Sequence, residues 1–177
     1  MTQLNSTLEW LFPKETQQSL LFINLRNSMS IKYQKALFDD NTVSQLLELS
    51  KMWVDEDCSF GMVANQKDDL HEPCYIALDG DKVVGYIFGK YFTEEKKTSY
   101  IEIGDKCFEV LELYVMPNYR SQGIGRTLFS LLENEVKDNV KYIVLATSTK
   151  DYQRTLKFYA KDNGMTYHSA YLIKETK

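Results

Sequence analysis

The sequence predicts an α+β protein in three layers, in which a mixed, mostly antiparallel sheet carries helices on both faces. In the first half of the chain, apolar runs alternate with short turns, which is typical of antiparallel hairpins. Between residues 109 and 146, an apolar run, a glycine-rich loop, an amphipathic helix and another apolar run follow one another, which indicates a right-handed unit with parallel strands. The 177 residues are long enough for one sizeable core, expected at 29–177 behind an extension at 1–28.

Composition and charge exclude several classes of protein. A hydrophobic content of 44% is typical of globular chains, and no run of about 18 apolar residues occurs that could span a membrane. The N-terminus lacks the profile of a secretion signal, so we expect a cytoplasmic protein. The net charge of −4 disfavours nucleic-acid binding and is compatible with a cationic partner. Three widely spaced cysteines and two histidines predict neither a disulfide framework nor a metal site.

The part of the chain before residue 74 has the weakest signals. We expect the extension at 1–28 to be helical, and either to pack on the domain or to contact a second subunit in a homodimer. The next expected elements, in chain order, are a strand over 29–38, a turn over 39–41, a helix capped by Asn41 or Thr42 that runs to about residue 53, and a short helix or loop over 54–73.

Two hairpins are expected next. The apolar runs 74–78 and 83–88 flank an Asp79-Gly80 turn, and Asp-Gly is a strong hairpin signal. The elements expected for the second hairpin are a charged loop over 93–97, a strand over 98–103, a turn over 104–106 and a strand over 107–115.

A strand, a loop and a helix between residues 109 and 137 organise the rest of the chain. Pro117 ends the apolar strand because proline cannot donate to a ladder. Apolar residues along one face predict the helix that begins near Ile124. The first N–H groups of a helix have no intrahelical partner, so a tight turn through Gly123 and Gly125 presents a socket for an anion.

The charges beside this loop point to a pyrophosphate. Arg120 and Arg126 lie on either side of the socket in the sequence and supply positive charge. The alternative interpretation of this loop is a plain glycine-rich turn from strand to helix that binds nothing. A Walker loop would need a lysine where Arg126 stands, and a dinucleotide fingerprint would need a glycine in place of Leu128.

The pattern Arg120-x-x-Gly123-x-Gly125, between an apolar strand and an amphipathic helix, resembles the acetyl-CoA loop of the GCN5-related N-acetyltransferase (GNAT) family. The resemblance implies the acyl-CoA N-acyltransferase fold, in which two parallel strands splay apart around the cofactor. It also implies the residues that hold acetyl-CoA: Leu113, Tyr114, Val115, Arg120, Ser121, Gln122, Gly123, Ile124, Gly125, Arg126, Tyr152 and Tyr159.

The last third of the chain completes this unit. A buried strand is expected over 140–146 and a helix over 151–163 that ends at Gly164. Leu156-Lys-Phe-Tyr159 before Gly164-Met165 is similar to a signature of the family, in which the tyrosine protonates the departing thiolate. Tyr152 stands where the family often carries an asparagine. One closing strand is expected over 166–173, where the family often has two.

The function implied by the resemblance is acetyl transfer from acetyl-CoA to a primary amine, by direct attack in a ternary complex. The acceptor is a small molecule (a polyamine, an amino sugar or an amino acid) or a peptide. The base candidates are Glu112 and Glu109, because a carboxylate on a buried strand needs a task or a partner. Strand alternation puts them on opposite faces, and Glu112 lies nearer the expected cofactor site. Alternatively, Glu112 is a structural carboxylate paired with Arg120 or a backbone N–H. The alternative function is an acyl-CoA-binding sensor or regulatory module.

Overall fold

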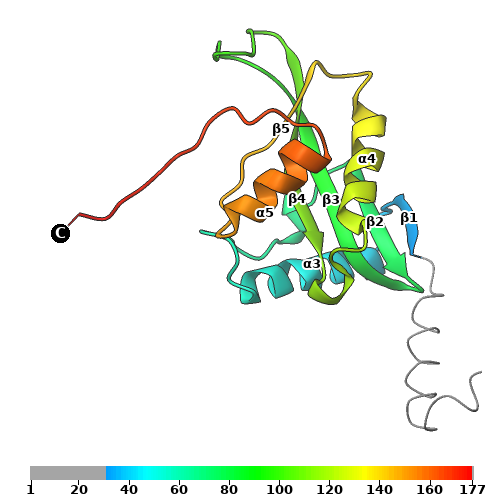
Figure 1. Ribbon diagram of the computed structural model, residues 1–177. Coiled ribbons are helices and arrows are strands. Elements are labelled where there is room, and N and C mark those ends of the chain that lie inside the picture. The colour runs from blue at the N-terminus through cyan, green and yellow to red at the C-terminus, as the bar shows by residue number, and fades with distance from the viewer. Residues whose placement is uncertain (1–30, 177) are drawn as a thin grey trace, which may run out of the picture.

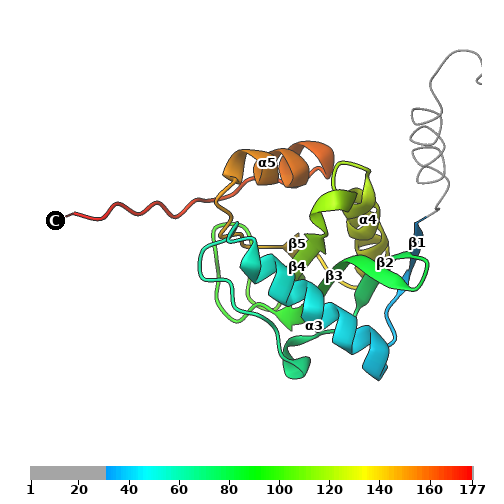
Figure 2. The same cartoon turned by 90° about the horizontal axis from the view of Figure 1, so that it is seen from below.

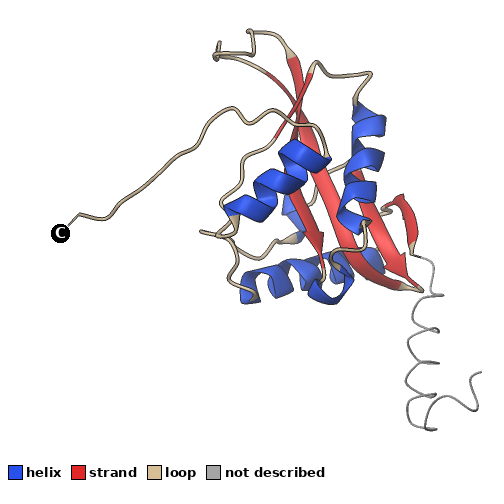
Figure 3. Cartoon of the chain, viewed as in Figure 1, coloured by secondary structure: helices blue, strands red, loops and turns tan. Residues whose placement is uncertain are grey.

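The computed structural model describes residues 31–176, so the expected extension at 1–28 and the domain boundary at 29 lie outside the described residues. Five strands form one sheet in the order β1-β2-β3-β4-β5, and Figure 1 and Figure 3 show it between helices. The strands are β1 (Lys32–Lys35), β2 (Cys74–Asp79), β3 (Lys82–Thr93), β4 (Lys106–Val115) and β5 (Tyr142–Val144). Pairing is antiparallel from β1 to β4 and parallel between β4 and β5, so the predicted mixed sheet is confirmed.

Helices cover both faces of this sheet. Helix α3 (Asp40–Asp55) lies on one face, and α4 (Ile124–Val136) and α5 (Tyr152–Leu156) lie on the other, as Figure 2 shows. The core lies between these layers, and its largest fully buried side chains include Leu46, Ile76, Tyr86, Phe88, Phe108, Leu128 and Leu132. No helix in residues 31–176 is long and apolar enough to cross a membrane.

The start of α3 differs from the prediction of a turn at 39–41. Asp39 is the N-cap, and its carboxylate accepts a hydrogen bond from the N–H of Thr42 at 2.7 Å. A carboxylate is also favoured there by the helix dipole, so the helix begins before Asn41. Residues 56–73 are mainly loop, with a short 3₁₀ turn at Lys67–Asp69.

The first predicted hairpin is confirmed, but the strand predicted over 98–103 is wrong. Strand β3 continues to Thr93 and pairs with β4 up to Lys106, so the second connection is a loop over 94–105. At its first residues β4 has β3 on one edge and β5 on the other, so this part of β4 has no edge for the segment over 98–103. Thr98 instead starts a turn, in which its side-chain oxygen accepts from the N–H of Ile101 at 3.1 Å.

The end of the chain also departs from the prediction. Strand β5 has three residues instead of the seven expected over 140–146, and α5 continues as a π-helical turn over Lys157–Asp162. Gly164 follows with a φ of 70°, which fits the predicted helix end. The closing strand over 166–173 is wrong, because none of these residues forms a strand. His168 instead contacts Ser99 of the loop over 94–105 at 2.7 Å, and the chain after it extends away from the domain in Figure 1.

A β-bulge interrupts the pairing of β3 with β4 near the predicted site. Phe88 pairs with Glu112 and Gly89 with Val110, so Leu111 is the extra residue. The bulge lies between Glu109 and Glu112, so the regular alternation assumed for this strand does not hold.

Gly89 is required at this bulge, and its replacement by alanine should lower the free energy of unfolding by about 3 kcal/mol in urea denaturation. A Cβ there would collide with the backbone oxygen of Glu109 and the ring of Phe108. The matched control is Gly125→Ala, whose Cβ would lie 3.5 Å from the Phe158 ring in ordinary contact, and which should change stability by less than about 1 kcal/mol. Equal losses in both variants would contradict this account.

Candidate active site

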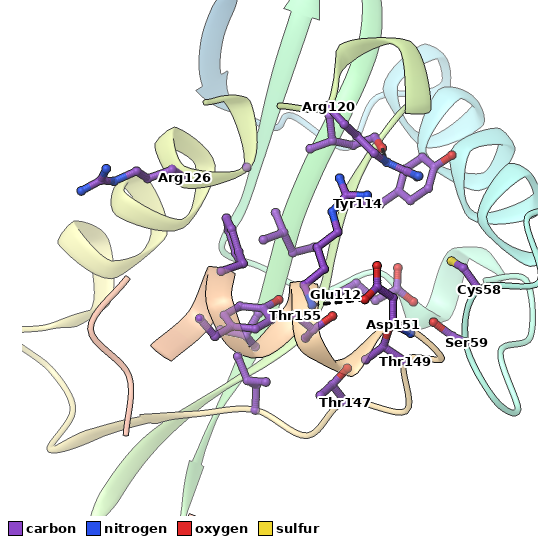
Figure 4. Close-up of a pocket in the computed structure, with 18 of the residues that line it drawn as sticks. Cys58, Ser59, Glu112, Tyr114, Arg120, Arg126, Thr147, Thr149, Asp151 and Thr155 are labelled. Carbon is purple, nitrogen blue, oxygen red and sulfur yellow. Dashed lines mark hydrogen bonds between the residues drawn. The ribbon is translucent and has the colours of Figure 1, made fainter. Parts of the chain in front are cut away.

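A cleft opens where β4 and β5 separate. The two strands pair at three positions, from Cys107 with Tyr142 to Glu109 with Val144, after which β5 ends and β4 continues to Val115. The cleft has a volume of about 710 Å³. Its walls come from the second half of β4, the loop before α4, the segment after β5 and helix α5 (Figure 4).

The glycine-rich loop forms one end of this cleft. Gly123 is the N-cap of α4 with a φ of 83°, a left-handed conformation that favours glycine, and no side chain caps the helix there. The first N–H groups of α4 have no intrahelical acceptor, and no side chain of residues 31–176 caps them. With the dipole of the 13-residue helix behind them, they form an anion socket at the edge of the cleft.

Arg120 is held by three groups of the protein. Its Nε donates to the backbone oxygen of Val115 at 2.7 Å, its Nη2 donates to Glu56 at 2.8 Å, and the guanidinium lies 5.4 Å from the centroid of the Tyr114 ring. The charge of Arg120 is thus balanced by Glu56. In this arrangement the guanidinium fixes the loop to the end of β4.

Glu56 joins this network from the end of α3. It also accepts a hydrogen bond from the hydroxyl of Tyr114 at 2.6 Å. Burial raises the pKa of the Glu56 carboxyl, but the hydrogen bonds from Arg120 and Tyr114 outweigh it, and the net pKa is lowered. Arg126, by contrast, is exposed, and Figure 4 shows its side chain on α4 well away from Arg120.

Glu112 is held differently, by two neutral donors. Its Oε2 accepts from the hydroxyl of Tyr86 at 2.6 Å and from the side-chain amide of Asn65 at 2.9 Å. Burial raises the pKa of Glu112 and the charge of Asp69 adds to this, while the two hydrogen bonds oppose it without cancelling the rise. The pairing with Arg120 or a backbone N–H considered for Glu112 is wrong.

Tyr159 lines the same cleft from the π-helical turn after α5. Its ring packs edge to face on Phe129 and Phe158, with centroid distances of 6.0 and 4.9 Å. Burial raises the pKa of Tyr159 to about 12, so its hydroxyl keeps its proton near neutral pH. In this protonated form the hydroxyl can donate a proton and cannot act as a base.

The structure brings most of the predicted residues together on this cleft. Those that line it are Glu112, Leu113, Tyr114, Val115, Arg120, Ser121, Gly123, Ile124, Gly125, Arg126 and Tyr159. Three predicted residues do not line it. Glu109 pairs with Lys90 at 3.5 Å, Gln122 is exposed and donates to the backbone oxygen of Asn118, and the side chain of Tyr152 is 62% exposed.

The sequence did not predict the residues that orient the side chains of this site, because they are far from those side chains along the chain. Asn65 and Tyr86 orient Glu112, and Glu56 orients Arg120. Asn65 and Glu56 belong to the segment after α3, which carries no motif, and Tyr86 reads as an ordinary aromatic of a buried strand. No signal in the sequence connects these residues with their partners.

Comparison with known proteins agrees with this geometry. A family model described as the acetyltransferase (GNAT) family matches residues 40–165. No curated protein matches the chain significantly.

Solved structures share the fold at low identity. An aminoglycoside acetyltransferase from an uncultured soil metagenomic sample, in complex with trehalose, matches at 16% identity and a TM-score of 0.61, over 83% of this chain and 96% of that one. A predicted acetyltransferase with acetyl-CoA from Clostridium acetobutylicum matches at 19% identity and a TM-score of 0.59, over 82% of this chain and 96% of that one. A ribosomal-protein-alanine N-acetyltransferase from Brucella melitensis matches at 16% identity and a TM-score of 0.57, over 82% of this chain and 99% of that one.

Replacing Glu56 by glutamine should lower the free energy of unfolding at pH 7 by about 2 kcal/mol, because hydrogen bonds to a charged partner are lost. Since folding lowers the pKa of Glu56, its contribution is complete above the unfolded-state value of about 4.3 and is lost as the pH falls through the lower folded-state value. Denaturation at several pH values should therefore show that the difference in the free energy of unfolding between the wild type and Glu56→Gln becomes smaller in acid.

The control for this prediction is Glu135→Gln. Glu135 also pairs with a cation, Lys35, at 2.8 Å, but this pair lies on the surface, so its loss should be much smaller at pH 7. A difference for Glu56→Gln that is independent of pH would show that the carboxylate charge is not the cause.

Proposed function

Because this chain belongs to the acetyltransferase (GNAT) family, whose model matches more than half of it, we propose that it transfers an acetyl group from acetyl-CoA to a primary amine. The acceptor is a small molecule or a peptide, and the amine attacks directly while both substrates are bound. Holding the two together supplies much of the rate by proximity, so no covalent enzyme intermediate is needed.

The cleft between β4 and β5 fits the acetyl donor. Its volume of about 710 Å³ suits a large cofactor, and its mouth carries the anion socket at Gly123. In our proposal the N–H groups from Gly123 to Arg126 bind the pyrophosphate, while Leu113, Tyr114 and Val115 line the path of the pantetheine arm. Acetyl-CoA supplies the acetyl group as an activated thioester.

One observation carries the assignment of the base. Glu112 lines the cofactor cleft and also a second cavity of about 470 Å³. A base must reach the amine beside the thioester, and a residue on the wall shared by two cavities has that position. The raised pKa of Glu112 brings it closer to neutrality, where a carboxylate accepts a proton from an ammonium group more readily.

Protons leave and enter the reaction through two side chains in this proposal. Glu112 takes a proton from the amine as the new C–N bond forms. Tyr159, which stays protonated, donates to the sulfur as the C–S bond breaks. Backbone N–H groups of β4 stabilise the negative charge that develops on the carbonyl oxygen.

The structural neighbours include acetyltransferases with different acceptors. One is an aminoglycoside acetyltransferase and another is a ribosomal-protein-alanine N-acetyltransferase. An amine acceptor for this chain is in keeping with both. The cytoplasmic location and the homodimer expected from the sequence stay predictions.

The proposed function predicts that the purified protein releases free thiol from acetyl-CoA when amines are present. Glu112→Gln keeps an oxygen for Tyr86 and Asn65 but removes the base, and should lower kcat/KM by about 100-fold. In the wild type, kcat/KM should fall in acid around a pKa above the usual glutamate value, and the variant should lose this limb.

Glu109→Gln serves as the control, because Glu109 pairs with Lys90 and does not line the cleft. It should keep nearly wild-type turnover. Thiol release that is absent with every amine, in a protein that still binds acetyl-CoA, would favour the sensor or regulatory module instead.

The anion socket can be tested by binding alone. Gly123→Ala forces an alanine into a φ of 83°, which should cost about 1–2 kcal/mol of stability and displace the N–H groups, so calorimetry should show coenzyme A binding at least about tenfold more weakly. Gly80→Ala is the matched control, because Gly80 has a φ of 61° in the hairpin turn, away from the cleft. It should lose stability but bind coenzyme A normally. Normal binding by Gly123→Ala would contradict the socket.

A further inference from the structure

The second cavity is placed to hold the acceptor. Its walls are the loop between α3 and β2 together with strands β3 and β4. Its volume of about 470 Å³ lies within the range of small-molecule sites. Leu111 and Glu112 line both this cavity and the cofactor cleft, so a molecule bound here adjoins the proposed reaction centre.

The side chains that line this cavity include two carboxylates and no lysine or arginine of the described residues. Two carboxylates line it, Asp69 from the 3₁₀ turn and Glu112 from β4, and the one other titratable group among its described lining residues is His71. No lysine or arginine of residues 31–176 lines it, and neither carboxylate forms an ion pair with those residues. The cavity therefore presents two negative charges that the described protein does not balance.

Each carboxylate has an oxygen available for a ligand. Both hydrogen bonds to Glu112 end on Oε2, so Oε1 accepts none from residues 31–176. Asp69 uses Oδ2 to accept from the N–H of Gln66 at 2.8 Å, which fixes the carboxylate at the end of the turn. Phe88 and other apolar side chains also line the cavity, and they can contact the carbon chain of an acceptor.

We propose that this cavity selects small acceptors with two amino groups, of which one reacts beside Glu112 and the other stays protonated beside Asp69. The inference rests on the proposed function and specifies its substrate class. A second ammonium balances the charge of Asp69 once the acceptor has displaced water, which a monoamine cannot do. An amino acid would bring its own carboxylate toward Asp69, and this repulsion disfavours it.

The test compares three acceptors with the same four-carbon chain: putrescine with two amino groups, butylamine with one, and γ-aminobutyrate with an amine and a carboxylate. Initial rates of thiol release give kcat/KM for each. We expect putrescine to exceed butylamine by at least about tenfold after correction for its two equivalent ends, and γ-aminobutyrate to be the poorest.

Asp69→Asn isolates the charge, because asparagine keeps an oxygen for the N–H of Gln66. It should lower kcat/KM for putrescine by about tenfold, mainly through KM, while butylamine changes by less than about twofold and the KM of acetyl-CoA is unchanged. The matched control is Asp68→Asn, which removes an exposed carboxylate of the same turn that does not line the cavity. It should keep the preference for putrescine.

The outcomes separate this inference from the proposed function. Turnover of butylamine equal to that of putrescine, or an unchanged preference in Asp69→Asn, would overturn the inference and leave the acetyltransferase assignment standing. Binding of acetyl-CoA without turnover of any amine would overturn both. A melting temperature of Asp69→Asn equal to that of Asp68→Asn shows that any difference between them is not one of folding.

Discussion

The parallel pairing of β4 with β5 stops after three residue pairs, and the rest of the site depends on this early end. Because β5 ends at Val144 while β4 continues to Val115, the second half of β4 has an edge that no strand of residues 31–176 occupies. A free edge presents unpaired backbone groups, and here these line a cleft instead of pairing with another strand. The loop at Gly123 and the start of α4 then close the cleft at the end of β4.

Two glutamates near this cleft show how the surroundings divide their tasks. Glu56 faces Arg120 and the hydroxyl of Tyr114, so its ionised form is stabilised and its pKa is lowered. Burial raises the pKa of Glu112, and the charge of Asp69 adds to the rise. The hydrogen bonds from its two neutral donors do not cancel it. The first carboxylate suits a fixed structural charge, and the second suits proton transfer.

The sequence predicted correctly the turns that depend on residues close along the chain. It predicted wrongly two strands, because a strand also needs a neighbouring strand to pair with. The Asp79-Gly80 turn and the Gly123 turn were found because their backbone conformations favour glycine, with φ values of 61° and 83° at the two glycines. The strands expected over 98–103 and 166–173 have suitable residues, but a strand also needs a free edge of a neighbour. The start of β4 has β3 and β5 on its two edges and offers none to the first segment, and the second does not pair with the three-residue strand β5.

The sequence by itself determined the unit from β4 through α4, including the glycine-rich turn and the resemblance that it carries, because each part depends on residues close along the chain. Only the tertiary structure decided which charges are free to act. The partners of Glu112 lie 26 and 47 positions away, and Glu56 lies 64 positions from Arg120. Whether a buried charge is neutralised, hydrogen-bonded or left open to a ligand depends on such neighbours, and their distances follow from packing rather than from local sequence.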